Sequence, residues 1–599
     1  KCKIGRERRD FASARWTIIP SEISAGLKSH FAAFAEEASP LFGRRLRVAA
    51  GHVQEGAPLV KARLDAKDLP GEGYRLHCRK DWVELAGRDE AGLFYGLQTL
   101  KQILLQTGAA LPEIVIEDYP DFAHRGFMLD ISRCKTPTMK TLYDYVDLLA
   151  YLKINHLQLY TEHTFAFSAH ETVWSDAAPM TAQEIMALDA YCQDRYIELT
   201  PNQNSFGHFE RWLVHPEYKH LAEAPEGFRH PLNNEWRGPS TLKPDRASLA
   251  FLDTLYAELL PNFSSGLFNV GCDETWELGT GRSSRVCKTK GAQSVYLGFL
   301  KRIERLVSKR GRRMMFWGDI ILKEPKLIGE LPKDIIALNW GYEADYDFAQ
   351  TCRRFAESGI PFFVCPGTSS WNSLLGRTDN SLRNIASAAR NGLKHGAVGC
   401  LITDWGDNGH HQYKPISYVG IAAGAANSWA HRANVGLDIV QSLNLHIFRD
   451  STTQLGKALY ELGNLYAQSP APPKNRTIFN DMLFWDMKAL PPSLTRMTPQ
   501  SAQACTDELS RQEEVLGRAQ ARCCDAELVK AELCNAIAMT KHGLNRYRAH
   551  LDTEMDRRPL RRELLRIIGE HARLWLQRNR HGGLYESSSK LRALLAPLE

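Results

Sequence analysis

Two adjacent carboxylates, Asp273 and Glu274, follow a short apolar run that begins at Phe268, and Trp276 lies two residues further on. Charged side chains at the end of a buried strand are costly unless they are paired or used, so they indicate a functional site. The alternative is a pair of solvated acids before a helix N-terminus, where acids are favoured. This stretch alone leaves both interpretations open.

Adjacent acids on a strand end permit more than one kind of acid–base chemistry. Neighbouring strand side chains point to opposite faces, so both acids reach one ligand only where the strand breaks. We expect Glu274, beside indoles, to be partly desolvated and to stay protonated as a general acid, and Asp273 to stay an anion. The two carboxyls of a usual retaining glycosidase flank the scissile bond about 5–5.5 Å apart, which neighbours in sequence do not match. The alternative is that one carboxylate orients a nucleophile carried by the substrate itself.

Polar and aromatic side chains also follow seven other short apolar runs. In chain order they are Asp130 and Arg133, Glu162 and His163, Asn202, Asn204 and His208, Trp317 and Asp319, Trp340 and Tyr342, Trp371 and Asn372, and Asp404, Trp405 and Asp407. A single tryptophan belongs more often to a core than to a binding site, but several at equivalent positions favour a site. Indole faces beside carboxylates suit a sugar, whose C–H faces stack on rings while its hydroxyls bond to acids.

Motifs for other chemistries are absent from the sequence. It contains no HExxH or CxxC metal-ligand spacing and no Gly-x-Ser-x-Gly nucleophile turn. His410 and His411 with Asp404 and Asp407 could in principle hold a metal, but a polar loop at the mouth of the fold is the favoured interpretation. We therefore expect no metal and no cofactor.

The eight apolar runs predict the element that positions these residues. Each run is followed by a helical stretch, and together they occupy about 300 residues, the usual scale of a (β/α)₈ barrel: 126–130, 156–160, 196–200, 268–272, 314–317, 335–340, 361–365 and 400–404. A doubly wound open sheet is the competing arrangement, but no glycine-rich phosphate loop follows the first strand. In such a barrel the site lies at the carboxyl ends of the strands.

The barrel is predicted to lie between two other domains. Residues 1–118 read as a small α/β domain, 119–432 as the barrel and 433–599 as a helical domain. The first has expected strands at 15–19, 46–50, 74–78 and 82–87 and helices at 24–37 and 90–105. The last has amphipathic helices at 453–467, 501–520, 526–551 and 561–578. These helices are expected to pack on the barrel, and a role in a homodimer is the alternative.

The composition limits which kinds of partner the chain is expected to have. A net charge of +6 over 599 residues is no argument for a nucleic-acid partner. No run of about 18 apolar residues is present, so no membrane-spanning helix is expected. Thirteen cysteines without CxxC spacing indicate mostly reduced thiols, which favours a reducing compartment such as the cytoplasm. A signal peptide before Lys1 would not be visible.

From about Tyr74 to Trp429 the sequence resembles the β-N-acetylhexosaminidases of glycoside hydrolase family 20. The motifs that carry the resemblance occur in family order. They are Ala91 to Leu100, Ile116 to Pro120, His124 to Asp130, Gly207-His208, Gly271-x-Asp273-Glu274 and Trp405-Gly406-Asp407. Any one of these motifs would be weak evidence, but their order on the predicted strands makes the resemblance specific.

The resemblance implies substrate-assisted retention, in which the 2-acetamido oxygen attacks the anomeric carbon and forms an oxazolinium ion. It implies that Glu274 protonates the leaving oxygen and that Asp273 bonds to the acetamido N–H. The implied substrate is an amino-sugar glycan or glycoconjugate. The implied substrate-binding residues are Arg125 on the O3 and O4 hydroxyls, Trp317, Trp340, Trp371 and Trp405 around the sugar, Glu162 and His208 supporting the acid, and Asp407 on O4 or O6.

Several positions depart from the family pattern. Asn269 replaces a usual histidine, and Asp407 replaces a glutamate. The loop 367–372 contains no tyrosine to bind the acetamido oxygen, so Tyr342 is the candidate substitute. The alternative class is a non-catalytic barrel that binds amino sugars, which would need one of the two carboxylates to be lost. A hydrolase of another substrate-assisted family is disfavoured by the order of the motifs.

Overall fold

The N-terminal part of the chain forms a sheet with helices on one face. The computed structural model describes residues 2–10, 17–20, 23–43, 46–48, 59–79, 82–232, 234–469 and 472–598. Seven strands are ordered β1-β7-β5-β6-β4-β2-β3: β1 (Cys2–Asp10), β2 (Thr17–Pro20), β3 (Arg47–Val48), β4 (Leu59–Leu64), β5 (Tyr74–Cys78), β6 (Trp82–Gly87) and β7 (Ala110–Asp118). The predicted strand residues Arg15, Trp16, Ala49 and Ala50 lie outside the described part of the chain.

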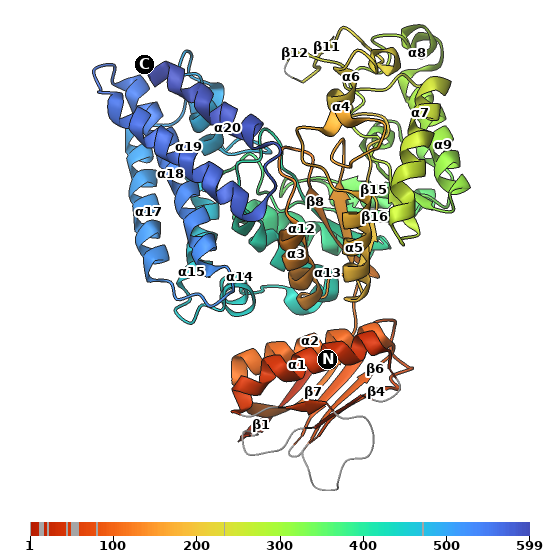
Figure 1. Ribbon diagram of the computed structural model, residues 1–599, viewed down its shortest axis with the longest axis vertical. Coiled ribbons are helices and arrows are strands. Elements are labelled where there is room, and N and C mark those ends of the chain that lie inside the picture. The colour runs from red at the N-terminus through yellow and green to blue at the C-terminus, as the bar shows by residue number, and fades with distance from the viewer. Residues whose placement is uncertain are drawn as a thin grey trace.

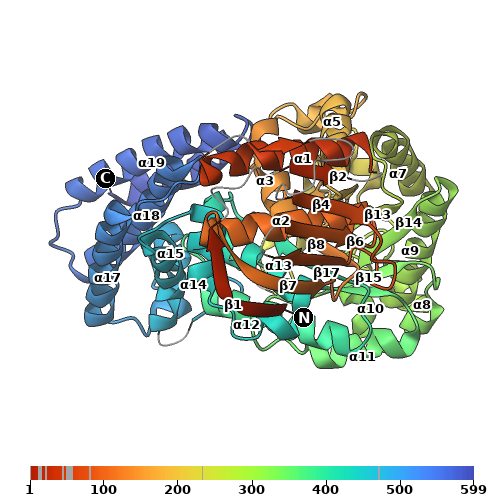
Figure 2. The same cartoon turned by 90° about the horizontal axis from the view of Figure 1, so that it is seen from below.

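Helices α1 (Ala25–Ala38) and α2 (Glu90–Thr107) cover the side of this sheet that faces the rest of the molecule (Figure 1). The view from below shows both helices lying over the sheet (Figure 2). Asp89 caps α2 by accepting a hydrogen bond from the Gly92 N–H, which satisfies one of the free donors of the first turn. Leu93, Leu97 and Leu100 then recur at helical spacing and are buried.

Eight parallel strands form the predicted barrel, which confirms the fold class. They are β8 (His124–Asp130), β9 (His156–Tyr160), β10 (Glu198–Thr200), β13 (Leu267–Asn269), β14 (Arg313–Trp317), β15 (Ile336–Trp340), β16 (Phe362–Cys365) and β17 (Gly399–Asp404). Their order is β10-β9-β8-β17-β16-β15-β14-β13. A parallel bridge between Asn202 and Asn269 joins the two ends of this order and closes the barrel.

Helices between the strands cover the barrel from outside. They are α3 (Met139–Tyr151), α5 (Ala182–Gln193), α7 (Arg246–Leu259), α9 (Ala292–Lys309), α11 (Phe348–Ser358), α12 (Thr378–Lys394) and α13 (Tyr418–Ala430). Thr181 and Glu184 form a capping box at the start of α5, and the Asp245 carboxylate caps α7. The connection after β10 is longer and carries α6 (Glu210–Leu213) and the hairpin of β11 (Phe228–Arg229) and β12 (Trp236–Arg237).

The C-terminal region is helical and lies beside the barrel (Figure 1). Its helices include α15 (Gln454–Asn464), α16 (Ile478–Phe484), α17 (Pro499–Arg518), α18 (Ala526–Leu551), α19 (Arg558–Arg578) and α20 (Leu584–Arg592). The amphipathic pattern predicted four of these, while the short helices α16 and α20 escaped it. Within the described residues, none of the helices combines the length and apolar composition needed to cross a bilayer.

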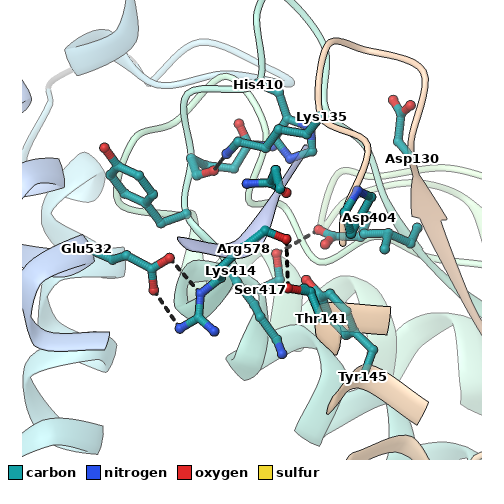
Figure 3. A pocket seen from close by; sticks show the side chains of 15 residues that line it. Asp130, Lys135, Thr141, Tyr145, Asp404, His410, Lys414, Ser417, Glu532 and Arg578 are labelled. Carbon is teal, nitrogen blue, oxygen red and sulfur yellow. Dashed lines mark hydrogen bonds and ion pairs between the residues drawn. The ribbon is translucent and has the colours of Figure 1, made fainter. Parts of the chain in front are cut away.

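A buried polar cluster joins the helical domain to the barrel (Figure 3). Arg578 donates two hydrogen bonds to Glu532, at 2.7 and 2.8 Å. On the barrel side Thr141 donates to the Arg578 carbonyl, and Lys135 donates to the Gln412 carbonyl. The cavity between these groups measures about 30 Å³, which is room for water rather than for a sugar. We therefore take this cluster to be an interface between domains.

Candidate active site

A cavity of about 360 Å³ lies at the carboxyl ends of the barrel strands, where the sequence placed the site. It is large enough for one sugar ring. Its lining contains most of the predicted residues, namely Arg133, His208, Asp273, Glu274, Trp317, Trp340, Tyr342, Trp371, Trp405 and Asp407, together with Gly341, Glu343, Tyr346, Lys474 and Asn475, which were not predicted. Of the predicted set, Glu162 lies next to this cavity and Arg125 lies elsewhere.

The chain after β13 turns sharply, so that Asp273 and Glu274 both line the cavity. Gly271, Cys272 and Glu274 have φ angles of 65°, 69° and 49°, in the left-handed region. Such conformations are costly for residues other than glycine and concentrate at functional sites. The Tyr296 hydroxyl holds the turn by donating to the Cys272 carbonyl at 2.8 Å. A side chain at Gly207 would collide with the Asp273 carbonyl, so the Gly207-His208 motif lets the two loops pack.

His208 connects the two acids to a third. Its Nε2 lies 3.3 Å from Asp273 Oδ2 and 3.7 Å from Glu274 Oε2, and its Nδ1 lies 3.8 Å from Glu162 Oε1. Burial alone would lower the pKa of His208, but the Asp273 carboxylate overcomes this and raises the pKa to about 10. At neutral pH the imidazole is therefore positively charged and stands beside both catalytic candidates.

Arg133 supplies the second positive charge of the site. Its guanidinium lies 3.2 Å from Asp130 and 3.0 Å from Glu162. It also lies over the rings of Tyr160 and Trp405, with 4.4 and 5.2 Å between Cζ and the ring centroids. Asp130 accepts two backbone N–H bonds through Oδ1, so its position is fixed. The guanidinium is thus held rigidly at the wall of the cavity, where it can bind sugar hydroxyls.

The structure corrects the prediction for Arg125. This residue is the second of β8, whose last residue is Asp130, so roughly 16 Å of strand separates it from the cavity at about 3.3 Å per residue. Its side chain is fully buried, donates to the Lys153 and Phe122 carbonyls and pairs with Glu72 at 2.6 Å. Arg125 therefore anchors the N-terminal domain to the barrel, and Arg133 occupies the place beside the cavity.

Indole and phenol rings form the wall opposite the acids. Trp340 and Tyr342 stack with centroids 5.2 Å apart, and Tyr342 meets Trp371 edge to face at 5.1 Å. Three of the indole N–H groups have protein acceptors: Trp340 donates to Asp319, Trp371 to Asn475 and Trp405 to the Tyr342 hydroxyl. These bonds fix the ring orientations.

Two polar atoms in the cavity wall have no hydrogen-bond partner among the described residues. They are the acceptor Asp273 Oδ1 and the donor Trp317 Nε1, and both are buried. Leaving a buried polar atom unsatisfied costs about 1–3 kcal/mol, so such atoms call for a ligand or water. A ligand group that carries both an N–H and an oxygen would satisfy the pair.

Two further acids line or border the cavity, and both have raised pKa values. Burial, and then the charge of Asp273, raise the pKa of Asp319 to about 7. Burial also raises the pKa of Asp407 to about 6, although Arg133 opposes the shift. Asn372 donates to Asp407 at 3.1 Å and holds it at the edge of the cavity. The Glu274 side chain is 38 % exposed, so it is less buried than its predicted position beside the indoles implied.

The C-terminal domain contributes two residues that the sequence did not predict. Asn475 accepts the Trp371 indole N–H at 3.0 Å, and its own N–H donates to Glu343 at 2.6 Å. Lys474 lines the same cavity and pairs with Asp345 at 3.1 Å. Both lie about 100 residues after the strand whose loop they support. No motif marks them, because only the packing of the helical domain brings them to the site.

Metal-ligating side chains do not gather at this cavity in the described part of the chain. Among the described residues, one group has ligand atoms close enough together to hold an ion. It consists of His124, His156 and Glu198 and lies at the opposite end of the barrel. His156 Nε2 already lies 2.9 Å from the Gln158 side-chain nitrogen. His410 and His411 were the two histidines that the sequence offered as possible metal ligands, and His411 hydrogen-bonds to the Ser587 carbonyl of α20.

A closed parallel barrel with paired acids and ring walls at its carboxyl end places the chain among the (β/α)₈ glycoside hydrolases. Family models identify the particular group. The model described as "Glycosyl hydrolase family 20, catalytic domain" matches residues 122–371, and "Glycosyl hydrolase family 20, domain 2" matches residues 9–119. The chain belongs to glycoside hydrolase family 20, and the resemblance read from its motifs is confirmed.

Curated relatives agree with this assignment, and a solved structure shares the fold. A beta-hexosaminidase of Porphyromonas gingivalis is 24% identical over 307 residues, covering 46% of this chain and 39% of that protein. One of Akkermansia muciniphila is 28% identical over 277 residues, covering 42% and 56%. The Flavobacterium johnsoniae chitobiase structure superposes with a TM-score of 0.61 at 16% identity, covering 99% of this chain and 98% of that one. The matches thus span less than two thirds of those two curated relatives.

Proposed function

We propose that this protein is an exo-acting β-N-acetylhexosaminidase that removes terminal non-reducing N-acetylglucosamine or N-acetylgalactosamine with retention. The observation that carries the proposal is the pair of buried atoms, Asp273 Oδ1 and Trp317 Nε1, that lack partners among the described residues. An acetamido group offers the N–H and the oxygen that would satisfy them. The beta-hexosaminidase relatives support the same reading.

Glycosidic cleavage would use the substrate's own acetamide as the nucleophile. Asp273 accepts the acetamido N–H, and the acetamido oxygen attacks the anomeric carbon. The bond from that carbon to the leaving oxygen breaks as Glu274 gives the oxygen its proton. Asp273 then faces the positive charge of the oxazolinium ring. In the second step Glu274 takes a proton from water, the water oxygen attacks the anomeric carbon, and the acetamide is restored.

The remaining residues would hold the sugar in place. Arg133 takes the role expected of Arg125 and binds the O3 and O4 hydroxyls, with Asp407 on O4 or O6. Trp317, Trp340, Trp371 and Trp405 enclose the ring and the acetamido methyl. Tyr342 accepts from the Trp405 indole, so its own proton is available for the acetamido oxygen. His208 and Glu162 support the acid pair through the contacts given above.

Glu274→Gln tests the proposal. It should lower kcat on an aryl N-acetyl-β-hexosaminide by about 10²–10⁴-fold, the usual contribution of a general acid, while binding of the substrate persists. A thiazoline that mimics the oxazolinium ion should inhibit the wild type. Equal cleavage of an aryl glucoside without the acetamide would contradict substrate assistance. Binding of N-acetylhexosamine by the wild type without any hydrolysis would instead indicate a non-catalytic sugar-binding barrel.

The preference between the two amino sugars depends on the O4 position. Asp407 lies at the edge of the cavity beside Asn372, and the side chain is one methylene shorter than the glutamate usual in the family. Paired aryl glucosaminide and galactosaminide substrates, compared by kcat/KM, would decide which sugar the site prefers.

A further inference from the structure

A second cleft opens from the sugar cavity beyond Glu274. It measures about 780 Å³, and Glu274, His208 and Asp407 line both spaces. Asp273 and Trp317 line only the sugar cavity. If Glu274 protonates the leaving oxygen, as the proposed function states, the leaving group must lie on the side of Glu274 away from Asp273. The second cleft is therefore where the leaving group lies.

Segments from two domains form the walls of this cleft. The hairpin of β11 and β12 belongs to the long connection after β10, whereas α20 belongs to the C-terminal domain, and both lie at the same end of the barrel (Figure 1). Trp276, two residues after Glu274 in the chain, also lines the cleft. An indole there offers a flat face to a sugar ring. A volume of this size and an aromatic platform suit a glycan rather than a small alcohol.

Basic side chains border the cleft on both sides. Arg237 projects from β12 and Lys590 from α20. Lys590 has no acidic partner within the described residues, although it is only partly exposed. Arg237 has a loose contact with Glu235 at 3.8 Å, and its side chain is 51 % exposed. Both cations are therefore available to a ligand.

Two more cations come from the segment before α16. Lys474 and Arg476 line the cleft and pair with Asp345 and Asp481 at 3.1 and 3.0 Å. Neither of these aspartates lines the cleft. The Lys474–Asp345 pair is exposed on both sides and contributes little free energy, so Lys474 can turn toward an anionic ligand at small cost.

We propose that the leaving group is an acidic glycan, whose carboxylate or sulfate is bound by Arg237 and Lys590. The proposal rests on the proposed function, because that function assigns the leaving-group side. It makes the C-terminal helical domain a determinant of specificity, since α20 supplies one of the two cations. Both acidic groups present oxygen acceptors and a negative charge to the same cations, so one arrangement serves either.

The test compares disaccharides that differ only in the acidic group of the leaving sugar. In the first pair the leaving sugar is a uronic acid in one disaccharide, and in the other it is the same sugar with its carboxyl reduced to an alcohol. A second pair carries a hexose with or without a sulfate ester. For the wild type, kcat/KM should be about three- to tenfold higher for an acidic member than for its neutral parent, as two exposed charge contacts allow. This preference should shrink as ionic strength rises.

The double variant Arg237→Gln/Lys590→Gln should lose the preference. Lys309→Gln is the matched control, because Lys309 is an exposed lysine at the end of α9, outside the cleft, and it should keep the wild-type ratio. Whichever acidic pair shows the preference identifies the source as carboxylate or sulfate. Equal kcat/KM within both pairs, or an unchanged ratio in the double variant, would overturn the proposal.

A binding measurement separates this inference from the proposed function. In Glu274→Gln, where hydrolysis is blocked, calorimetry should give a lower Kd for an acidic disaccharide than for its neutral parent. Failure of the wild type to cleave any aryl N-acetylhexosaminide would refute the proposed function. Equal Kd values for acidic and neutral disaccharides would refute the acidic leaving group, whatever the activity.

Discussion

Arg133 is the residue whose position most directly links charge to sugar binding. Its guanidinium lies between Asp130 and Glu162 and faces the cavity over the Trp405 ring. Arg133→Gln should lower kcat/KM on an aryl N-acetylhexosaminide by about 100-fold, because a charge-assisted pair of bonds to sugar hydroxyls is worth about 2–3 kcal/mol. Steady-state kinetics would measure the loss.

Arg125→Gln is the matched control for that prediction. It breaks the buried pair with Glu72, so it should lower Tm. The folded enzyme should nevertheless keep a KM near that of the wild type, because Arg125 lies at the opposite end of strand β8 from the cavity. A large rise in KM from Arg125→Gln, with none from Arg133→Gln, would reverse the assignment of the two arginines.

Asp319 should make stability depend on pH. The pKa of Asp319 is raised to about 7 in the folded protein, mainly by burial, from an ordinary value near 4. Its contribution to stability is therefore fully present below about pH 4 and is lost as pH rises to about 7. Asp319→Asn removes this loss, keeps an acceptor for Trp340, and should stabilise the protein by about 1–3 kcal/mol above pH 7.

Chemical unfolding of the wild type and Asp319→Asn across pH 4–8 would measure this effect. The difference in unfolding free energy should grow from near zero at pH 4 and level off above pH 7. A difference that stays constant with pH would show that Asp319 is ionised throughout. A difference of the opposite sign, with Asp319→Asn less stable than the wild type across this pH range, would mean that its pKa is lowered instead.

The sequence was informative about the site wherever a strand end carried the chemistry. Asp273, Glu274, Trp317 and Trp405 follow apolar runs directly, so the strand pattern alone brings them to one end of the barrel. The error at Arg125 has a simple physical origin. A motif fixes the order of residues but not which end of the strand each one occupies, and five positions of β8 separate Arg125 from Asp130 at the cavity end.

At the scale of elements, the segment before α16 completes the wall of the sugar cavity. Asn475 adopts a φ of 59° and accepts the Trp371 indole. Asparagine tolerates this left-handed conformation better than most residues. Asn475→Gly keeps the backbone freedom but removes the acceptor, so Trp371 loses its fixed orientation. We expect KM for an aryl N-acetylhexosaminide to rise about five- to tenfold, from a lost hydrogen bond of about 1 kcal/mol or slightly more.

Asn475→Asp is the companion to this variant, since it retains an acceptor for the indole and should stay within about twofold of the wild-type KM. Kinetics would be compared with the intrinsic fluorescence of the indoles, because a freed Trp371 should change its emission on sugar binding. An unchanged KM in Asn475→Gly would show that Trp371 needs no support from the helical domain.

Prediction of the elements succeeded where periodicity was long and failed where it was short. The longer amphipathic helices carry enough repeats to be recognised, and the eight strands, although short, were recognised as apolar runs that each precede a helical stretch; the structure has both. Helix α16 has seven residues and α20 has nine, which is too few turns for an apolar stripe to stand out. Lys474 and Asn475 escaped for the same reason, because they lie beside α16 on a segment without a pattern.

At the scale of the whole molecule, the barrel and the helical domain depend on each other. The C-terminal segment supports Trp371, and α20 borders the second cleft beyond Glu274. The interface contains the buried pair of Glu532 and Arg578, next to Lys135 and Asp404 of the barrel (Figure 3). Arg578 also bonds through its carbonyl to Thr141 of α3. Loss of this pair should therefore lower the stability of both the barrel and the helical domain.

Glu532→Gln tests this dependence. Glu532 is 1 % exposed and binds Arg578 through both carboxylate oxygens, so the change leaves a buried guanidinium with less compensation. Breaking a buried pair costs about 3 kcal/mol, although Asp525 still pairs with Arg578 at 2.9 Å. In differential scanning calorimetry the unfolding of barrel and helical domain should shift together to lower temperature.

Glu513→Gln removes the more exposed pair with Lys541 between α17 and α18, and should change stability by less than about 0.5 kcal/mol. A separate early transition in Glu532→Gln, with the barrel transition unmoved, would show that the two domains unfold independently.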